Sequence, residues 1–195
     1  MTFIFKNKFI SYFLITILGI SNGLSVAFFS NFPNNTLWGF SYFSSSILGF
    51  WIFTTSLIVL YSEKRIVSGV NAFLYVYFVF LVTGIFKSIR AFHSLYSLYD
   101  TINEMILGEW WKWLLYGCPA LICMFLALIL WQGRKNTKTG KIILWAPAFV
   151  IGIELIQLYV FVIRNHTHLF VTLLNSICFL LYLFIFKKQL FNLAK

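Results

Sequence analysis

The sequence has few charges, and few of those are acidic. Of 195 residues, 10% are charged, and Asp and Glu number only five against 15 Lys and Arg. So little charge excludes an intrinsically disordered chain and leaves too few polar side chains to cover a soluble domain. Hydrophobic residues make up 61% of the chain, and the mean hydropathy is +0.87. We therefore expect an integral membrane protein.

Cysteines and catalytic motifs are also scarce. The three cysteines, Cys118, Cys123 and Cys178, lie in apolar runs and form no C-x-x-C pair, which argues against a disulfide framework and a metal knuckle. The sequence contains no H-E-x-x-H, no Walker loop and no G-x-S-x-G. We expect no catalytic residue, no metal site and no cofactor.

The dominant feature of the sequence is a series of long apolar runs. A helix of about 20 apolar residues crosses the hydrocarbon core of a bilayer. The six predicted spans are residues 9–29, 37–61, 68–86, 112–131, 142–163 and 169–186. We therefore predict an all-α fold, with residues 1–195 forming one bundle of six transmembrane helices.

The longest connection, between the third and fourth spans, has a helical pattern of its own. Apolar side chains recur every three or four residues from Ile89 to Ile106, with polar residues between them. The pattern predicts an amphipathic helix over residues 88–108 that lies on the outer membrane surface. Trp110, Trp111 and Trp113 follow it and are typical of an interfacial anchor.

The basic residues are unevenly distributed between the two sides of the membrane. With the amino terminus in the cytoplasm, eleven Lys and Arg lie inside and four outside, in line with the positive-inside rule. This predicts a cell-membrane protein with both termini cytoplasmic. Membrane insertion and attraction to anionic lipid account for the basic charge. We therefore expect the lipid bilayer as a partner and no nucleic acid.

One carboxylate lies deep in the fifth predicted span. Glu154 belongs to the run KIILWAPAFVIGIELIQLYVFVIR, residues 141–164, and a charge at the bilayer centre costs roughly 2.5–3.5 kcal/mol on insertion scales. Gln157, Phe161 and Arg164 share its helical face. Two interpretations are open: Glu154 joins two helices through hydrogen bonds, or it binds a solute. If Glu154 binds a solute, Glu154→Gln should leave folding nearly intact.

Polar side chains from four predicted spans reach a similar depth. They lie about 10–15 Å below the outer surface, judged from the helical rise of each residue. Small-molecule sites combine an apolar lining with a few placed polar groups, so we predict an outward-facing pocket. The predicted ligand-binding residues are Glu154, Gln157, Asn175, Asn22, Ser45 and Arg164.

The first predicted span carries a seam of small residues. Gly19, Gly23 and Ala27 share one helical face, and such a seam lets a second helix approach closely. The partner is either another helix of the same chain or a second membrane protein.

Two segments carry a family resemblance. FWIFTTSLIVLYS, residues 50–62, and VNAFLYVYF, residues 70–78, resemble stretches of small uncharacterised six-span membrane proteins of Gram-positive bacteria. That resemblance implies no activity. In size, span number and the small-residue seam, the chain is also similar to substrate-binding subunits of energy-coupling-factor vitamin transporters. The second likeness is architectural and includes no substrate motif.

These features favour a non-catalytic component that binds or transports a small solute. The alternative is an accessory, assembly or immunity subunit that docks against another membrane protein complex. An intramembrane enzyme is the third reading, and it requires a second titratable group beside Glu154.

Overall fold

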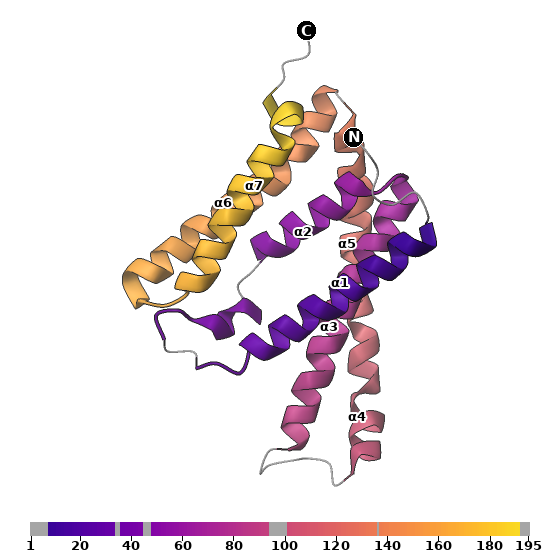
Figure 1. The fold of residues 1–195 in the computed structure, drawn as a ribbon, viewed down its shortest axis with the longest axis vertical. Coiled ribbons are helices and arrows are strands. Elements are labelled where there is room, and N and C mark those ends of the chain that lie inside the picture. The colour runs from indigo at the N-terminus through magenta and orange to yellow at the C-terminus, as the bar shows by residue number, and fades with distance from the viewer. Residues whose placement is uncertain (1–7, 34–35, 45–47, 94–100, 136, 192–195) are drawn as a thin grey trace.

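The computed structural model describes residues 8–33, 36–44, 48–93, 101–135 and 137–191. The elements are α1 (Lys8–Phe29), η1 (Phe40–Ser44), α2 (Leu48–Tyr61), α3 (Arg65–Phe92), α4 (Ile102–Leu115), α5 (Gly117–Leu130), η2 (Trp131–Arg134), α6 (Lys138–Asn165) and α7 (Leu169–Phe191) (Figure 1). Over these ranges every element is helical and none is a strand, which confirms the all-α class.

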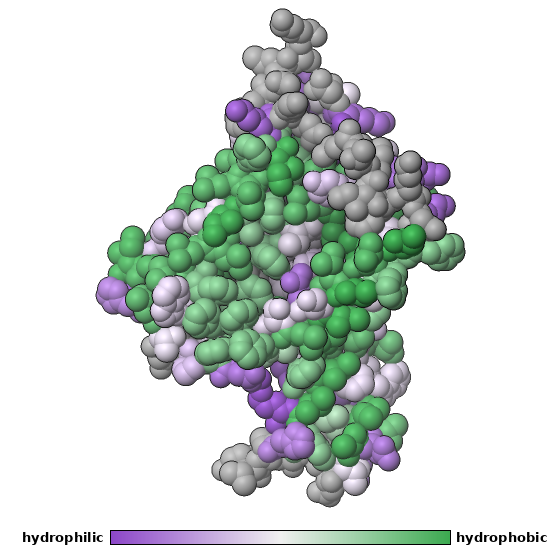
Figure 2. All heavy atoms as spheres, in the orientation of Figure 1, coloured by the Kyte–Doolittle hydropathy of each residue, from purple (hydrophilic) through white to green (hydrophobic). Residues whose placement is uncertain are grey.

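Five helical stretches are long and apolar enough to cross a bilayer. They are α1, α3, the run Ile102–Arg134 formed by α4, α5 and η2, α6, and the first 19 residues of α7. α1 and α3 run in the same direction, with the short helix α2 returning between them, and from α3 onward successive stretches alternate in direction (Figure 1). In Figure 2 hydrophobic residues cover most of the middle of the visible face, and hydrophilic residues gather mainly toward the two ends. This distribution fits a multi-pass membrane protein.

Helix α2 is the exception among the apolar helices. It has 14 residues, so it spans about 21 Å of the roughly 30 Å of a hydrocarbon core. The second predicted span began at residue 37, but residues 40–44 form the separate 3-10 helix η1 and α2 begins only at Leu48. Composition alone could not place this start, because it depends on contacts with α6 and α7.

The predicted interfacial helix over residues 88–108 also differs from the structure. Its first residues extend α3 to Phe92, and its last residues open α4 at Ile102, while residues 94–100 lie outside the described ranges. Thr101 caps α4 by accepting the Glu104 N–H at 3.2 Å. Helix α4 then leads directly into α5, and together with η2 they form one stretch, Ile102–Arg134, that is long and apolar enough to cross a membrane.

The bundle has two halves, one formed by α1, α3 and α5 and the other by α6 and α7, and α2 lies between them. α1 packs along α3, whose other side contacts α5, while α6 and α7 form an antiparallel pair (Figure 1). α2 contacts α3, α5, α6 and α7. The short helix therefore joins the two halves of the fold.

The small-residue seam of α1 faces inward. A Cβ atom added at Gly19 would lie 2.8 Å from the main-chain oxygen of Tyr75, and one at Gly23 would lie 2.9 Å from that of Val79. Ala27, the third member, is buried. Helix α3 therefore covers the seam, in agreement with the internal alternative for its partner.

Candidate functional site

Glu154 of α6 holds the first turn of α2. Its Oε1 accepts the main-chain N–H of Leu48 at 2.7 Å, and its Oε2 accepts the main-chain N–H of Gly49. The first N–H groups of a helix have no partner within that helix. A side chain 105 to 106 positions away in sequence therefore caps the start of α2.

Asn175 of α7 completes the environment of the carboxylate. Its Nδ2 donates a 3.0 Å hydrogen bond to Glu154 Oε2, and its side chain is fully buried. A Cβ atom at Gly49 would lie 2.8 Å from Glu154 Oε2 and 3.0 Å from Asn175 Oδ1. Glycine at position 49 thus lets α2, α6 and α7 meet at one point.

The electrostatics of this junction suit a negative charge. The amino end of a helix carries a partial positive charge, which stabilises an anion placed there. Among the described residues, three N–H groups donate to Glu154, two from α2 and one from Asn175. Arg164 lies ten residues further along α6, about 15 Å away in helical rise, and its side chain is exposed. Helix α2 and Asn175 therefore supply the compensation for the carboxylate.

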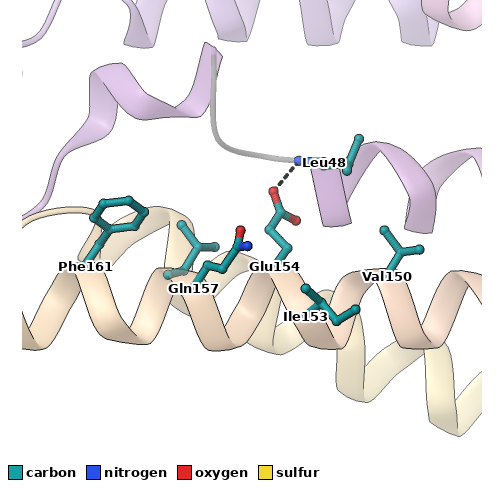
Figure 3. A pocket seen from close by; sticks show the side chains of 7 residues that line it. Leu48, Val150, Ile153, Glu154, Gln157 and Phe161 are labelled. Atoms are coloured by element: carbon teal, nitrogen blue, oxygen red, sulfur yellow. Dashed lines mark hydrogen bonds between the residues drawn. The ribbon is translucent and has the colours of Figure 1, made fainter.

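A pocket of about 360 Å³ lies against this junction. It is lined by Leu48, Val150, Ile153, Glu154, Gln157, Leu158 and Phe161. Figure 3 shows Glu154 and Gln157 projecting to the same side of α6, one helical turn apart, with apolar side chains on either side of them. The arrangement is a small apolar pocket with two polar side chains near its middle.

The structure brings together three of the six predicted ligand-binding residues: Glu154, Gln157 and Asn175. Asn22 belongs elsewhere, because its Nδ2 donates to the Tyr75 hydroxyl at 2.7 Å in the contact between α1 and α3. Arg164 is exposed near the end of α6 and does not line the pocket. Ser45 lies outside the described residues.

The sequence pattern did not reveal Leu48 or Gly49 as part of the site. Both act through main-chain N–H groups, which leave no trace in side-chain chemistry. The one available signal was Gly49, a glycine in an otherwise bulky apolar run, because such a glycine often marks a close approach.

The connection between α1 and α2 caps the first turn of α7 through main-chain hydrogen bonds. The carbonyls of Leu37 and Trp38 accept the N–H groups of Leu169 and Phe170 at 3.1 and 3.0 Å. Next to them the buried imidazole of His168 is stacked between Tyr42, at 3.6 Å between ring centroids, and Phe161, at 5.0 Å. This aromatic stack joins the pocket residue Phe161 to Tyr42 of η1.

A metal centre finds no support in the described ranges, which hold no group of three or more His, Cys, Asp or Glu side chains placed to share an ion. Cys178 follows Asn175 by three residues on α7. Its thiol is buried, and a reactive cysteine requires access and an electropositive setting. Cys178 is therefore a packing residue here.

Comparison with known proteins leaves the site to be interpreted on its own geometry: no family model, no curated protein and no solved structure matches the chain.

Proposed function

We propose that this protein is a non-catalytic membrane component that binds or transports a small solute in the pocket beside Glu154. One observation carries the proposal: a pocket of about 360 Å³ reaches Glu154, the carboxylate of α6 that caps the start of the short helix α2. Broken or short helices that end inside the membrane are a recurring way to place polar groups at a solute site.

The proposed orientation makes the pocket outward-facing. Glu154 lies 11 residues before the end of α6 at Asn165, which is about 16 Å of helical rise. Two links rich in Lys and Arg, around Lys64 and Arg134, lie at the opposite end of the bundle from Asn165. The positive-inside rule assigns that basic end, and with it both termini, to the cytoplasm.

Glu154 serves the fold and the pocket together in this proposal. Its three hydrogen bonds join α2, α6 and α7, which is the packing role considered above. The same carboxylate lines the pocket. A solute that contacts Glu154 thereby also contacts the group that holds α2, so solute binding should stabilise the fold.

The second candidate, a subunit that docks against another membrane protein, rests on α5. It exposes the large apolar side chains of Leu121, Ile122, Phe125 and Leu126. Of the 18-residue apolar segment identified within Ile102–Arg134, only 11% is buried inside the protein. Lipid covers such a face as well as a protein does, so this observation favours the alternative less strongly than the pocket favours solute binding.

The test is ligand-dependent stability of the purified full-length protein in detergent. A ligand that binds only the folded state raises the unfolding temperature in a saturable way. We expect at least one class of small solute to do so, and Val150→Trp, which fills the pocket, to abolish the effect. Phe149→Trp on the exposed neighbouring face is the matched control. If no cationic, neutral or anionic solute stabilises the wild type, the proposed function is wrong.

A further inference from the structure

The hydrogen-bonding capacity of Glu154 is not fully used. Each carboxylate oxygen accepts about two hydrogen bonds. Oε2 receives two, from Gly49 and Asn175, but of the described residues only Leu48 donates to Oε1. One acceptor position on Oε1 is therefore open, and Glu154 lines the pocket.

Gln157 offers a second acceptor beside the first. It lies one turn from Glu154 on the pocket-lining face of α6, and its side chain is exposed, with no hydrogen-bond partner among the described residues. The amide oxygen of a glutamine accepts hydrogen bonds. The pocket thus presents two neighbouring oxygen acceptors, one of them charged, within an apolar lining.

From this arrangement we infer that the pocket takes a small primary-amine cation, whose ammonium group donates to Glu154 Oε1 and to the Gln157 side-chain oxygen. The inference rests on the proposed function and names its ligand class. An ammonium group has three N–H donors and no acceptor, which matches a site of acceptors. The apolar residues Val150, Ile153 and Leu158 would contact a short hydrocarbon tail.

The same geometry disfavours other ligand classes. An anion would be repelled by the Glu154 carboxylate, and of the two polar side chains only the NH₂ group of Gln157 could donate to it. A quaternary ammonium has no N–H group and depends on a cage of several aromatic rings, but Phe161 is the one aromatic residue in the described lining. A bare calcium or magnesium ion needs about six oxygen ligands, and this pocket offers two side chains that could provide them.

Four probes of similar size test the inference: n-butylammonium, 1-butanol, butyrate and tetramethylammonium, at pH 7 and matched ionic strength. Unfolding of the wild-type full-length protein is followed with each. We expect saturable stabilisation by n-butylammonium at concentrations at least about tenfold below those needed for the other three, because a hydrogen bond to a charged group is worth roughly 1.5–3 kcal/mol.

Two variants separate the site from general effects. Gln157→Leu removes one acceptor but leaves the contacts of Glu154 with α2 in place, so it should weaken the n-butylammonium effect about tenfold without unfolding the protein. Gln132→Leu is the matched control, because Gln132 is exposed in η2 at the other end of α6. Its response should equal that of the wild type.

The outcomes distinguish the proposed solute-binding function from the inferred amine ligand class. If 1-butanol or tetramethylammonium stabilises as well as n-butylammonium does, the pocket binds solutes but the amine class is wrong. An unchanged response of Gln157→Leu overturns the assigned second acceptor and, with it, the inference. If none of the four probes stabilises the wild type but another solute class does, the proposed function stands and the amine inference is overturned.

Discussion

Leu48 and Glu154, 106 positions apart, are joined by a 2.7 Å hydrogen bond from a main-chain N–H to a side-chain oxygen. The bond fixes the position at which α2 begins and gives a half-buried carboxylate a structural task. It also means that changes at Glu154 act on the fold as well as on the pocket.

The first prediction concerns Glu154→Gln. The sequence alone led us to expect nearly intact folding, but in the structure both carboxylate oxygens accept N–H donors. A glutamine must point its NH₂ group at one of those donors, so we expect a loss of about 1–3 kcal/mol in the free energy of unfolding.

Chemical or thermal unfolding in detergent measures this loss. Glu63→Gln is the matched control, because Glu63 is exposed in the link before α3. Glu154→Leu should be at least as destabilising as Glu154→Gln, because it leaves all three donors unpaired. Stability equal to wild type in Glu154→Leu would show that the carboxylate neither caps α2 nor holds the helices together.

The second prediction tests the junction from the opposite side. Gly49→Ala places a methyl group 2.8 Å from Glu154 Oε2 and 3.0 Å from Asn175 Oδ1, so the three helices must separate slightly, at a cost of about 1–3 kcal/mol. Gly152→Ala is the control, since its Cβ would find its nearest neighbour at 3.8 Å, on Phe179. Equal unfolding temperatures of the two variants would contradict the close packing at Gly49.

The third prediction concerns the seam between α1 and α3. Gly19→Ala brings a Cβ atom to 2.8 Å from the Tyr75 carbonyl, a main-chain atom that has little room to move. We expect a loss of stability of about 1–3 kcal/mol with no change in the oligomeric state measured by light scattering. Gly117→Ala, with nothing within 4 Å of its Cβ, should show no loss. A variant of Gly19 that stays stable but changes its oligomeric state would place a second protein at the seam.

The fourth prediction concerns pH. Burial lowers the pKa of His168 because it disfavours the charged imidazolium. Between that lowered pKa and the ordinary value of about 6.5, the unfolded chain binds more protons than the folded chain. The contribution of His168 to stability is therefore complete above about pH 6.5 and is lost as the pH falls toward the folded-state pKa.

Thermal unfolding from neutral to mildly acidic pH, compared between wild type and His168→Gln, measures this contribution. The variant should lose stability less steeply as the pH falls. His93→Gln, at an exposed position at the end of α3, should follow the wild type. Parallel curves for wild type and His168→Gln would rule out His168 as the source of the pH dependence.

The fifth prediction concerns orientation. In a background without native cysteines, Asn165→Cys should react with a membrane-impermeant thiol reagent in intact cells, while Lys135→Cys should be protected until the cells are lysed. Both positions are exposed; Lys135 lies just before the start of α6 and Asn165 is its last residue. Labelling of Lys135→Cys alone in intact cells would reverse the proposed topology.

Much of the fold follows from local sequence features. Apolar runs long enough to cross a bilayer predict α1, α3, α5, α6 and α7, because length and hydropathy are properties of each segment alone. The start of α2 could not be predicted in this way. The run from Leu37 to Tyr61 carries no charged residue that would mark a boundary, and the helix begins where Glu154 can cap it.

The candidate site, too, could be predicted only in part from the sequence. A lone carboxylate in an apolar run identifies Glu154, and helical spacing links it to Gln157. Depth along each span also suggested Asn22, but depth does not fix the direction in which a side chain points around the bundle. Asn22 faces Tyr75 of α3 and Asn175 faces Glu154 of α6, at similar predicted depths.

The long-range cap also constrains the order in which the protein is made. Leu48 leaves the ribosome 106 residues before Glu154, a delay of roughly 5–20 s at a synthesis rate of about 5–20 residues per second. During that interval the first N–H groups of α2 lack their final partner, and unpaired main-chain groups are costly in hydrocarbon. Helix α2 must therefore wait at the membrane surface or beside the insertion machinery, and it reaches its final depth only after α6 has entered the bilayer.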